Sequence, residues 1–110
     1  MNEKVNNVVK IFDNGLPYWS NDLEFNMLFI KGSLHHCYDL FKARGYLFLN
    51  DVYKTLGFPL TRQGQIAGWI YNEEHMKDTM WTFWKAKDST NNINITFEVL
   101  ENILDVLPEE

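Results

Sequence analysis

The pattern that most constrains the fold is a long apolar stripe with helical spacing in the first half of the chain. Its members recur at alternating steps of four and three residues, which places them on one face of a helix: Leu23, Met27, Ile30, Leu34, Cys37 and Phe41. We predict a helix over residues 22–44, with Asn21 as its N-cap and Gly45 as its stop. Gly32 costs this helix about 1 kcal/mol relative to alanine, which predicts that another element passes close to it.

Residues 45–71 carry signals for a compact unit of extended chain, short helix, turn and strand. Residues 46–49 are aromatic and apolar, and indicate either a small strand or an extended connector. Asn50 is placed to cap a helix over residues 51–56, which Gly57 ends. We predict a strand over residues 65–71, where Gly68 marks a bulge or a close backbone approach. Trp69 in this strand is an expected core residue.

The second half of the chain favours antiparallel strands. Residues 79–87 alternate, with Trp81 and Phe83 on one side and Trp84 on the other, although residues 73–87 also fit a helix. Residues 93–99 alternate most regularly, and residues 103–107 are predicted to return as a last strand. The expected fold is α+β: one long N-terminal helix and one short helix packed on a mainly antiparallel meander of about four strands.

Length and composition predict one domain over residues 1–110, in which the polar residues 1–10 are either flexible or a weak edge element. The chain is 45% hydrophobic and 15% aromatic, which is enough for a small core. Its single cysteine excludes an internal disulfide and favours a reducing compartment. The polar start predicts no signal peptide, and no apolar run is long enough to span a membrane. We therefore expect a cytoplasmic protein.

The acidic charge is concentrated in the second half. The chain carries a net charge of −5, and residues 58–110 hold four basic residues against nine acidic ones. Such a surface repels a phosphate backbone. Residues 49–69 superficially resemble a helix-turn-helix, but the second segment contains two glycines and one basic residue, Arg62. We therefore expect no nucleic-acid partner. The acidic half either keeps the protein soluble or docks on a basic partner.

Few residues carry candidate chemistry. His35, His36 and Cys37 are consecutive, and three consecutive helical residues cannot bind one metal ion because neighbours point about 100° apart. His35 and Asp39 share a helix face and are expected to form a surface pair. Cys37 belongs to the apolar stripe, so it is expected to be a buried hydrophobe. We expect no catalytic residue, no metal and no cofactor.

A series of motifs over residues 17–107 resembles a known family. The matching residues are Trp19, Asn21 and Asp22; Lys42, Ala43, Arg44 and Gly45; Leu49, Asn50, Val52, Tyr53, Leu56 and Gly57; and Gly68, Trp69 and Tyr71. They resemble an uncharacterised family from phages and prophages of Gram-positive bacteria, known only as a domain of unknown function. The resemblance implies structural roles for these residues, as caps, turns and core aromatics, and implies no activity. It also implies that the cytoplasm is that of a bacterial host cell. Members of that family often carry an N-terminal hydrophobic segment that is missing here, so we expect no membrane role.

These observations predict a small non-enzymatic protein-interaction module, encoded by a phage or prophage, that inhibits or modulates a host defence protein. Its expected contact surface is an acidic, aromatic region of the sheet, made of Glu73, Glu74, Trp81, Trp84, Glu98 and Asp105. One alternative is a virion or packaging component that self-associates. A second is a small-ligand binder or enzyme with a pocket between helix and sheet, in which His35 and Asp39 supply the polar groups.

Overall fold

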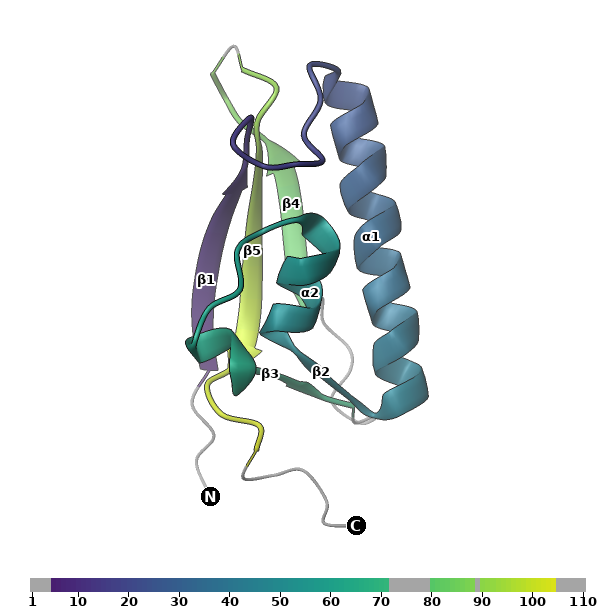
Figure 1. Cartoon of the computed structure of the whole chain (residues 1–110), viewed down its shortest axis with the longest axis vertical. Coiled ribbons are helices and arrows are strands. Elements are labelled where there is room, and N and C mark those ends of the chain that lie inside the picture. Colours follow the sequence, from purple (N-terminus) through teal and green to yellow (C-terminus); the bar gives the residue numbers. More distant parts are fainter. Residues whose placement is uncertain (1–4, 72–79, 89, 105–110) are drawn as a thin grey trace.

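The computed structural model describes residues 5–71, 80–88 and 90–104, which form two helices packed on an antiparallel sheet of five strands (Figure 1). The elements follow the chain as β1 Val5–Phe12, α1 Leu23–Arg44, β2 Tyr46–Phe48, α2 Leu49–Leu56, the 3-10 turn η1 Gln63–Gln65, β3 Gly68–Ile70, β4 Trp81–Lys85 and β5 Ile93–Leu100. The predicted α+β class, with one long and one short helix, is confirmed.

Strand β5 organises the sheet. It pairs with β1 from Val5↔Leu100 to Phe12↔Ile93, and with β4 from Trp81↔Phe97 to Lys85↔Ile93. It also meets β3 at Gly68↔Leu100, and β3 pairs with β2. The pairs β2–β3 and β4–β5 join strands that follow one another in the sequence, as in the predicted meander. The pair β1–β5 does not, because it joins the first strand to the last. Residues 5–10 belong to β1, an edge strand, which is the second of the two possibilities that the sequence left open for residues 1–10.

Helix α1 begins at Leu23, one residue later than predicted. Asp22, not Asn21, is the N-cap, because its carboxylate accepts a hydrogen bond from the Phe25 backbone nitrogen at 3.2 Å. Gly45 ends the helix in the left-handed conformation, as predicted, and donates its N–H to the Phe41 carbonyl. The expectation for Gly32 is wrong, because a Cβ added there would meet nothing within 4 Å.

Helix α2 is stopped as predicted but is capped differently. Gly57 adopts the left-handed conformation at its end. Helix α2 begins at Leu49, so Asn50 lies in its first turn and is not the N-cap. At the start of the helix, the Asp51 carboxylate accepts a hydrogen bond from the Phe48 backbone nitrogen at 3.0 Å. The Asn50 side chain instead fastens the following loop, since its amide makes two hydrogen bonds to the backbone of Thr61.

The predicted strand over residues 65–71 is shorter in the structure. Strand β3 covers only Gly68–Ile70 and follows the turn η1. Gly68 is required by a close backbone approach, as predicted, because a Cβ there would lie 2.1 Å from the Leu47 carbonyl oxygen of β2. The sequence left either a small strand or an extended connector open for residues 46–49. Residues 46–48 form a small strand, β2.

The hairpin β4–β5 confirms the strand interpretation for residues 81–85, while residues 73–79 of the helical alternative lie outside the described residues. The predicted return strand over residues 103–107 is wrong for its described part, because Ile103 and Leu104 are not in a strand. Ile103 is instead buried beside η1, where its N–H donates to the Ile66 carbonyl at 2.7 Å.

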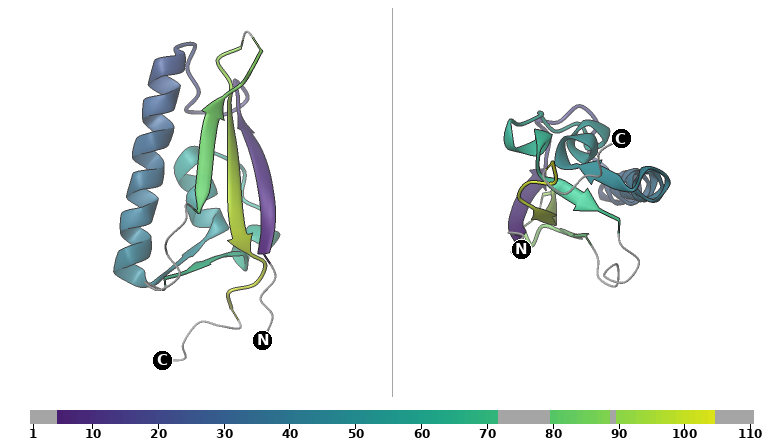
Figure 2. Two further views of the ribbon diagram at one scale, coloured as in Figure 1. Left: turned by 180° about the vertical axis from the view of Figure 1, so that it is seen from behind. Right: turned by 90° about the horizontal axis from the view of Figure 1, so that it is seen from below.

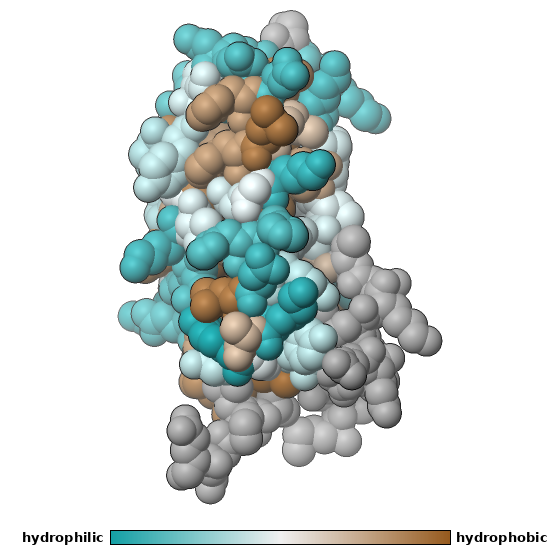
Figure 3. All heavy atoms as spheres, turned by 90° about the vertical axis from the view of Figure 1, so that its right-hand side faces the viewer, coloured by the Kyte–Doolittle hydropathy of each residue, from teal (hydrophilic) through white to brown (hydrophobic). Residues whose placement is uncertain are grey.

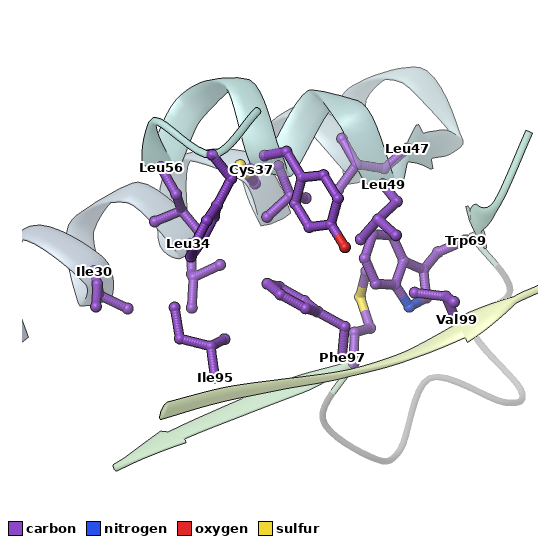
Figure 4. Close-up of a cluster of buried hydrophobic side chains, with 14 of the residues drawn as sticks. Ile30, Leu34, Cys37, Leu47, Leu49, Leu56, Trp69, Ile95, Phe97 and Val99 are labelled. Atoms are coloured by element: carbon purple, nitrogen blue, oxygen red, sulfur yellow. The ribbon is translucent and has the colours of Figure 1, made fainter. Parts of the chain in front are cut away.

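The core lies between the helices and one face of the sheet (Figure 4). Side chains from both helices and from β2 and β3 meet those of β5: Ile30, Leu34, Cys37, Leu47, Leu49, Leu56, Trp69, Ile95, Phe97 and Val99. Cys37 and Trp69 are both buried, as the sequence predicted. The apolar stripe of α1 faces this core.

Candidate functional site

The sheet of β1, β5 and β4 has two faces of different character. One face packs on the helices, and the other is covered by no helix of the described chain, as the rear view in Figure 2 shows. Residues on the uncovered face alternate with the core residues along each strand, and we call them the outer face: Val5, Asn7, Val9 and Ile11 of β1, Thr82 and Trp84 of β4, and Asn94, Thr96, Glu98 and Leu100 of β5.

The outer face exposes four large apolar side chains. Val9 is 62% exposed, Ile11 51% and Trp84 42%, and Val5 is exposed beside them. Glu98 is the one charged residue among the ten of the outer face. Contiguous exposed apolar residues with few charges are characteristic of binding surfaces in soluble proteins.

Strand register places the outer-face residues in rows across the sheet. Ile11 lies opposite Asn94, which lies opposite Trp84. The next row is formed by Val9, Thr96 and Thr82 in the same way. Directly opposed side chains in antiparallel strands are within contact distance, so each row is a continuous strip. The backbone pairing of the three strands fixes the positions of these strips relative to one another.

The predicted contact residues separate into three groups. Trp84 and Glu98 both lie on the outer face. Trp81 points the other way and is half-buried, with its ring 5.3 Å from that of Trp69. Glu73, Glu74 and Asp105 lie outside the described residues.

The sequence interpretation allowed a weak edge element over residues 1–10 but assigned none of its residues to the contact surface. Val5, Val9 and Ile11 supply three of the outer face's four large exposed apolar side chains. Their signal was present as a β-branched-rich run over residues 5–11, which favours a strand. The neighbouring Asn6 and Asn7 interrupt its alternation, so the run resembled a flexible end.

A second apolar surface lies between α1 and α2. A groove of about 530 Å³ is lined by Tyr18, Leu28, Phe29, Gly32, Ser33, His36 and Thr55. Figure 3 shows the apolar patch on the side of the molecule that presents α1, towards the N-terminal end of that helix. Phe25 and Leu28 are the exposed large apolar residues of α1. Gly32 leaves the groove open because it has no side chain.

The titratable residues of α1 do not form a reactive site. His35 Nε2 lies 3.5 Å from Asp39 Oδ2, and both side chains are largely exposed, which confirms the predicted surface pair. Neither residue lines the groove. Burial raises the pKa of the Cys37 thiol, which makes the nucleophilic thiolate harder to form. Within residues 5–71, 80–88 and 90–104, no three His, Cys, Asp or Glu side chains come together as metal ligands.

Comparison with known proteins identifies the family of this chain. Neither helix of the described chain is long and apolar enough to cross a lipid bilayer. No curated protein and no solved structure matches the chain. One protein family does match, over residues 1–107, which is nearly the whole sequence. The chain therefore belongs to DUF6353, a family of unknown function.

Proposed function

We propose that this chain is a non-enzymatic protein-interaction module that binds a protein partner through the outer face of its sheet, with Trp84 as the main contact. The observation that carries the proposal is the exposure of Trp84 within an uncovered face that has a single charged residue. A tryptophan held on a rigid strand is the residue type that most often dominates binding energy in protein interfaces.

The neighbours of Trp84 support a contact role. Thr82 lies on the same strand, and Asn94 and Thr96 lie opposite on β5, so the ring is flanked by short polar side chains. These residues offer hydrogen bonds around an apolar centre, which is the usual arrangement of a non-obligate interface. Glu98 lies further along the same face and offers a carboxylate to a basic partner group.

The acidic charge favours a basic partner. With a net charge of −5 concentrated in residues 58–110, the chain would attract a basic protein surface, most strongly at low ionic strength where screening is weak. Glu73, Glu74 and Asp105 remain predicted members of this contact region. The resemblance to phage and prophage proteins further suggests a partner inside an infected bacterium, such as a host defence protein that this chain inhibits or modulates.

The experiment is quantitative capture from bacterial lysate, with and without phage infection, read by mass spectrometry. The tagged wild-type chain is compared with Trp84→Ala and with Phe25→Ala, which removes an exposed aromatic ring from α1 instead. We expect Trp84→Ala to lose a stoichiometric partner at unchanged melting temperature, and Phe25→Ala to retain it. Equal capture by both variants would contradict the proposal.

The groove between α1 and α2 supports a second candidate, the binding of a small apolar ligand or side chain. Its apolar lining and its volume of about 530 Å³ are of the size found in ligand sites. The expected use of His35 and Asp39 is not favoured, since both lie outside the groove lining. Leu28→Trp would fill the groove, so it should abolish any thermal stabilisation by an apolar ligand that wild type shows.

A further inference from the structure

Strand β1 is an open edge of the sheet. It pairs with β5 on one side and ends the strand order β1-β5-β3-β2. Among the described residues, no other segment makes a backbone hydrogen bond to Val5–Phe12. An edge of eight residues with free backbone groups is a template for pairing with another strand.

The strand register identifies which β1 residues are open. Glu98 N donates to the Met80 carbonyl, so even-numbered residues of β5 direct their backbone groups to β4 and odd-numbered ones to β1. Phe97, an odd-numbered residue, lies opposite Val8. Even-numbered residues of β1 therefore bond to β5, and the odd-numbered ones direct both N–H and C=O to the open edge: Val5, Asn7, Val9 and Ile11.

We propose that a second copy of this chain pairs antiparallel with β1, about a two-fold axis at Val8, to form one continuous sheet across a symmetric dimer. In this register Val5 pairs with Ile11 of the other copy, and Asn7 with Val9. All four open residues of each copy then form hydrogen-bonded pairs. A shift by two residues in either direction leaves one of the four without a partner in the strand.

Side chains on both faces are self-complementary in this register. On the outer face, the exposed Val5 and Ile11 form apolar cross-strand pairs, one on each side of the axis. On the inner face, Lys10 lies opposite Asn6 of the other copy. The Asn6 amide bonds to the Glu101 carboxylate at 3.4 Å, so each Lys10 approaches an acidic group of its neighbour.

The position of Lys10 is informative. An inward-pointing lysine on an edge strand normally prevents strand pairing, because pairing would bury an uncompensated charge. Within one chain, the Lys10 ammonium lies 5.2 Å from the centre of the Tyr53 ring. Glu101 of a second copy compensates the charge in the proposed dimer, and only in the register centred on Val8 do Lys10 and Asn6 face each other.

A charge exchange tests the dimer with purified protein alone. Light scattering after size exclusion should show wild type moving from 13.1 kDa towards twice that mass as concentration rises. Lys10→Glu and Glu101→Lys each place like charges opposite one another, so each should raise the dimer dissociation constant about tenfold or more. The double variant restores opposite charges and should return the dissociation constant towards the wild-type value. Because Lys10→Glu also loses the contact with Tyr53, all masses are measured well below each variant's melting temperature.

Backbone variants give a second readout. Val9→Pro removes an N–H that points to the open edge of β1, and should leave only monomer. Lys85→Pro removes an edge-facing N–H of β4, the opposite edge, and should leave the dimer intact. A 13.1 kDa mass for wild type at all concentrations, or a dimer insensitive to Val9→Pro and to the charge exchange, would overturn the proposal. The inference is independent of the Trp84 partner, because these variants leave Trp84 in place and need no lysate.

Discussion

The indole of Trp69 stands edge-on to that of Trp81, with ring centroids 5.3 Å apart and planes at 87°. The same ring donates its Nε1–H to the Glu98 carbonyl at 2.6 Å. One side chain of β3 thus connects to β4 through aromatic packing and to β5 through a hydrogen bond. Since β3 and β5 share only the Gly68↔Leu100 pair, this contact joins the two parts of the sheet.

Trp69→Ala should therefore destabilise the whole fold. We expect a loss of about 3–5 kcal/mol in the free energy of unfolding, because the change removes a 6% exposed ring and leaves a cavity. This is a large share of the roughly 5–15 kcal/mol available to a small domain. Urea denaturation followed by circular dichroism measures it. Trp69→Phe keeps an aromatic ring but loses the hydrogen bond, so it should lower the free energy of unfolding by less than Trp69→Ala does. If both variants lose the same free energy, the stabilisation by Trp69 comes from the hydrogen bond and not from the packing of its ring.

Two glycines should respond in opposite directions to alanine. A Cβ at Gly68 would lie 2.1 Å from the Leu47 carbonyl oxygen, so Gly68→Ala must separate β2 from β3 and should cost about 3 kcal/mol or more. At Gly32 a Cβ meets nothing within 4 Å, so Gly32→Ala should stabilise helix α1 by about 1 kcal/mol, or roughly 4 °C in melting temperature. Calorimetry measures the melting temperatures of Gly68→Ala and Gly32→Ala, which should shift in opposite directions. Destabilisation by Gly32→Ala would show that its groove is filled by another segment in solution.

Local signals in the sequence predicted more of this structure than long-range pairing did. The stripe of α1, the left-handed stops at Gly45 and Gly57 and the close approach at Gly68 all depend on neighbours in sequence or on one backbone rule. Strand β1 was only one of two possibilities for residues 1–10, because its stability comes from β5, which lies about ninety residues away in the sequence. The return strand over residues 103–107 failed for the converse reason, since Ile103 alternates like a strand residue but bonds to Ile66 beside η1.

For the candidate site, too, local sequence patterns predicted more than did contacts between distant segments. Alternation in residues 81–84 already placed Trp81 and Trp84 on opposite faces, and the structure adds which of the two faces is covered. That depends on where α1 and α2 pack, which no pattern within β4 encodes. Glu98 joins Trp84 on the outer face only through the register of β4 with β5.

Asn26 should be a stability determinant despite its polar side chain. It is fully buried, and its amide accepts from the Ser20 nitrogen at 2.9 Å and donates to the carbonyls of Ser20 and Asn91. Asn26→Ala leaves these backbone groups unpaired in the interior and should cost about 3 kcal/mol. Chemical denaturation measures the change. The control is Asn21→Ala, an exposed residue whose side chain is not the helix cap, with an expected cost below about 0.5 kcal/mol. Equal costs would contradict the role of Asn26.

Alkaline pH should destabilise the protein through Tyr53. Burial raises the pKa of the Tyr53 hydroxyl to about 12, above its ordinary value near 10, because tyrosinate is poorly solvated in the core. The folded state therefore holds the phenolic proton more tightly than the unfolded state. Its contribution to stability is complete below pH 10 and is lost as pH rises from about 10 to about 12, and amounts to about 2–3 kcal/mol.

The measurement is urea denaturation at pH values from 8 to 12, with tyrosinate absorbance followed in parallel. Wild type should lose stability steeply above pH 10, whereas Tyr53→Phe should show a flatter profile over that range. Tyr18, which is 49% exposed, supplies the control: Tyr18→Phe should retain the wild-type slope. If Tyr53→Phe and Tyr18→Phe have the same slope, the alkaline transition arises from groups other than the buried phenol.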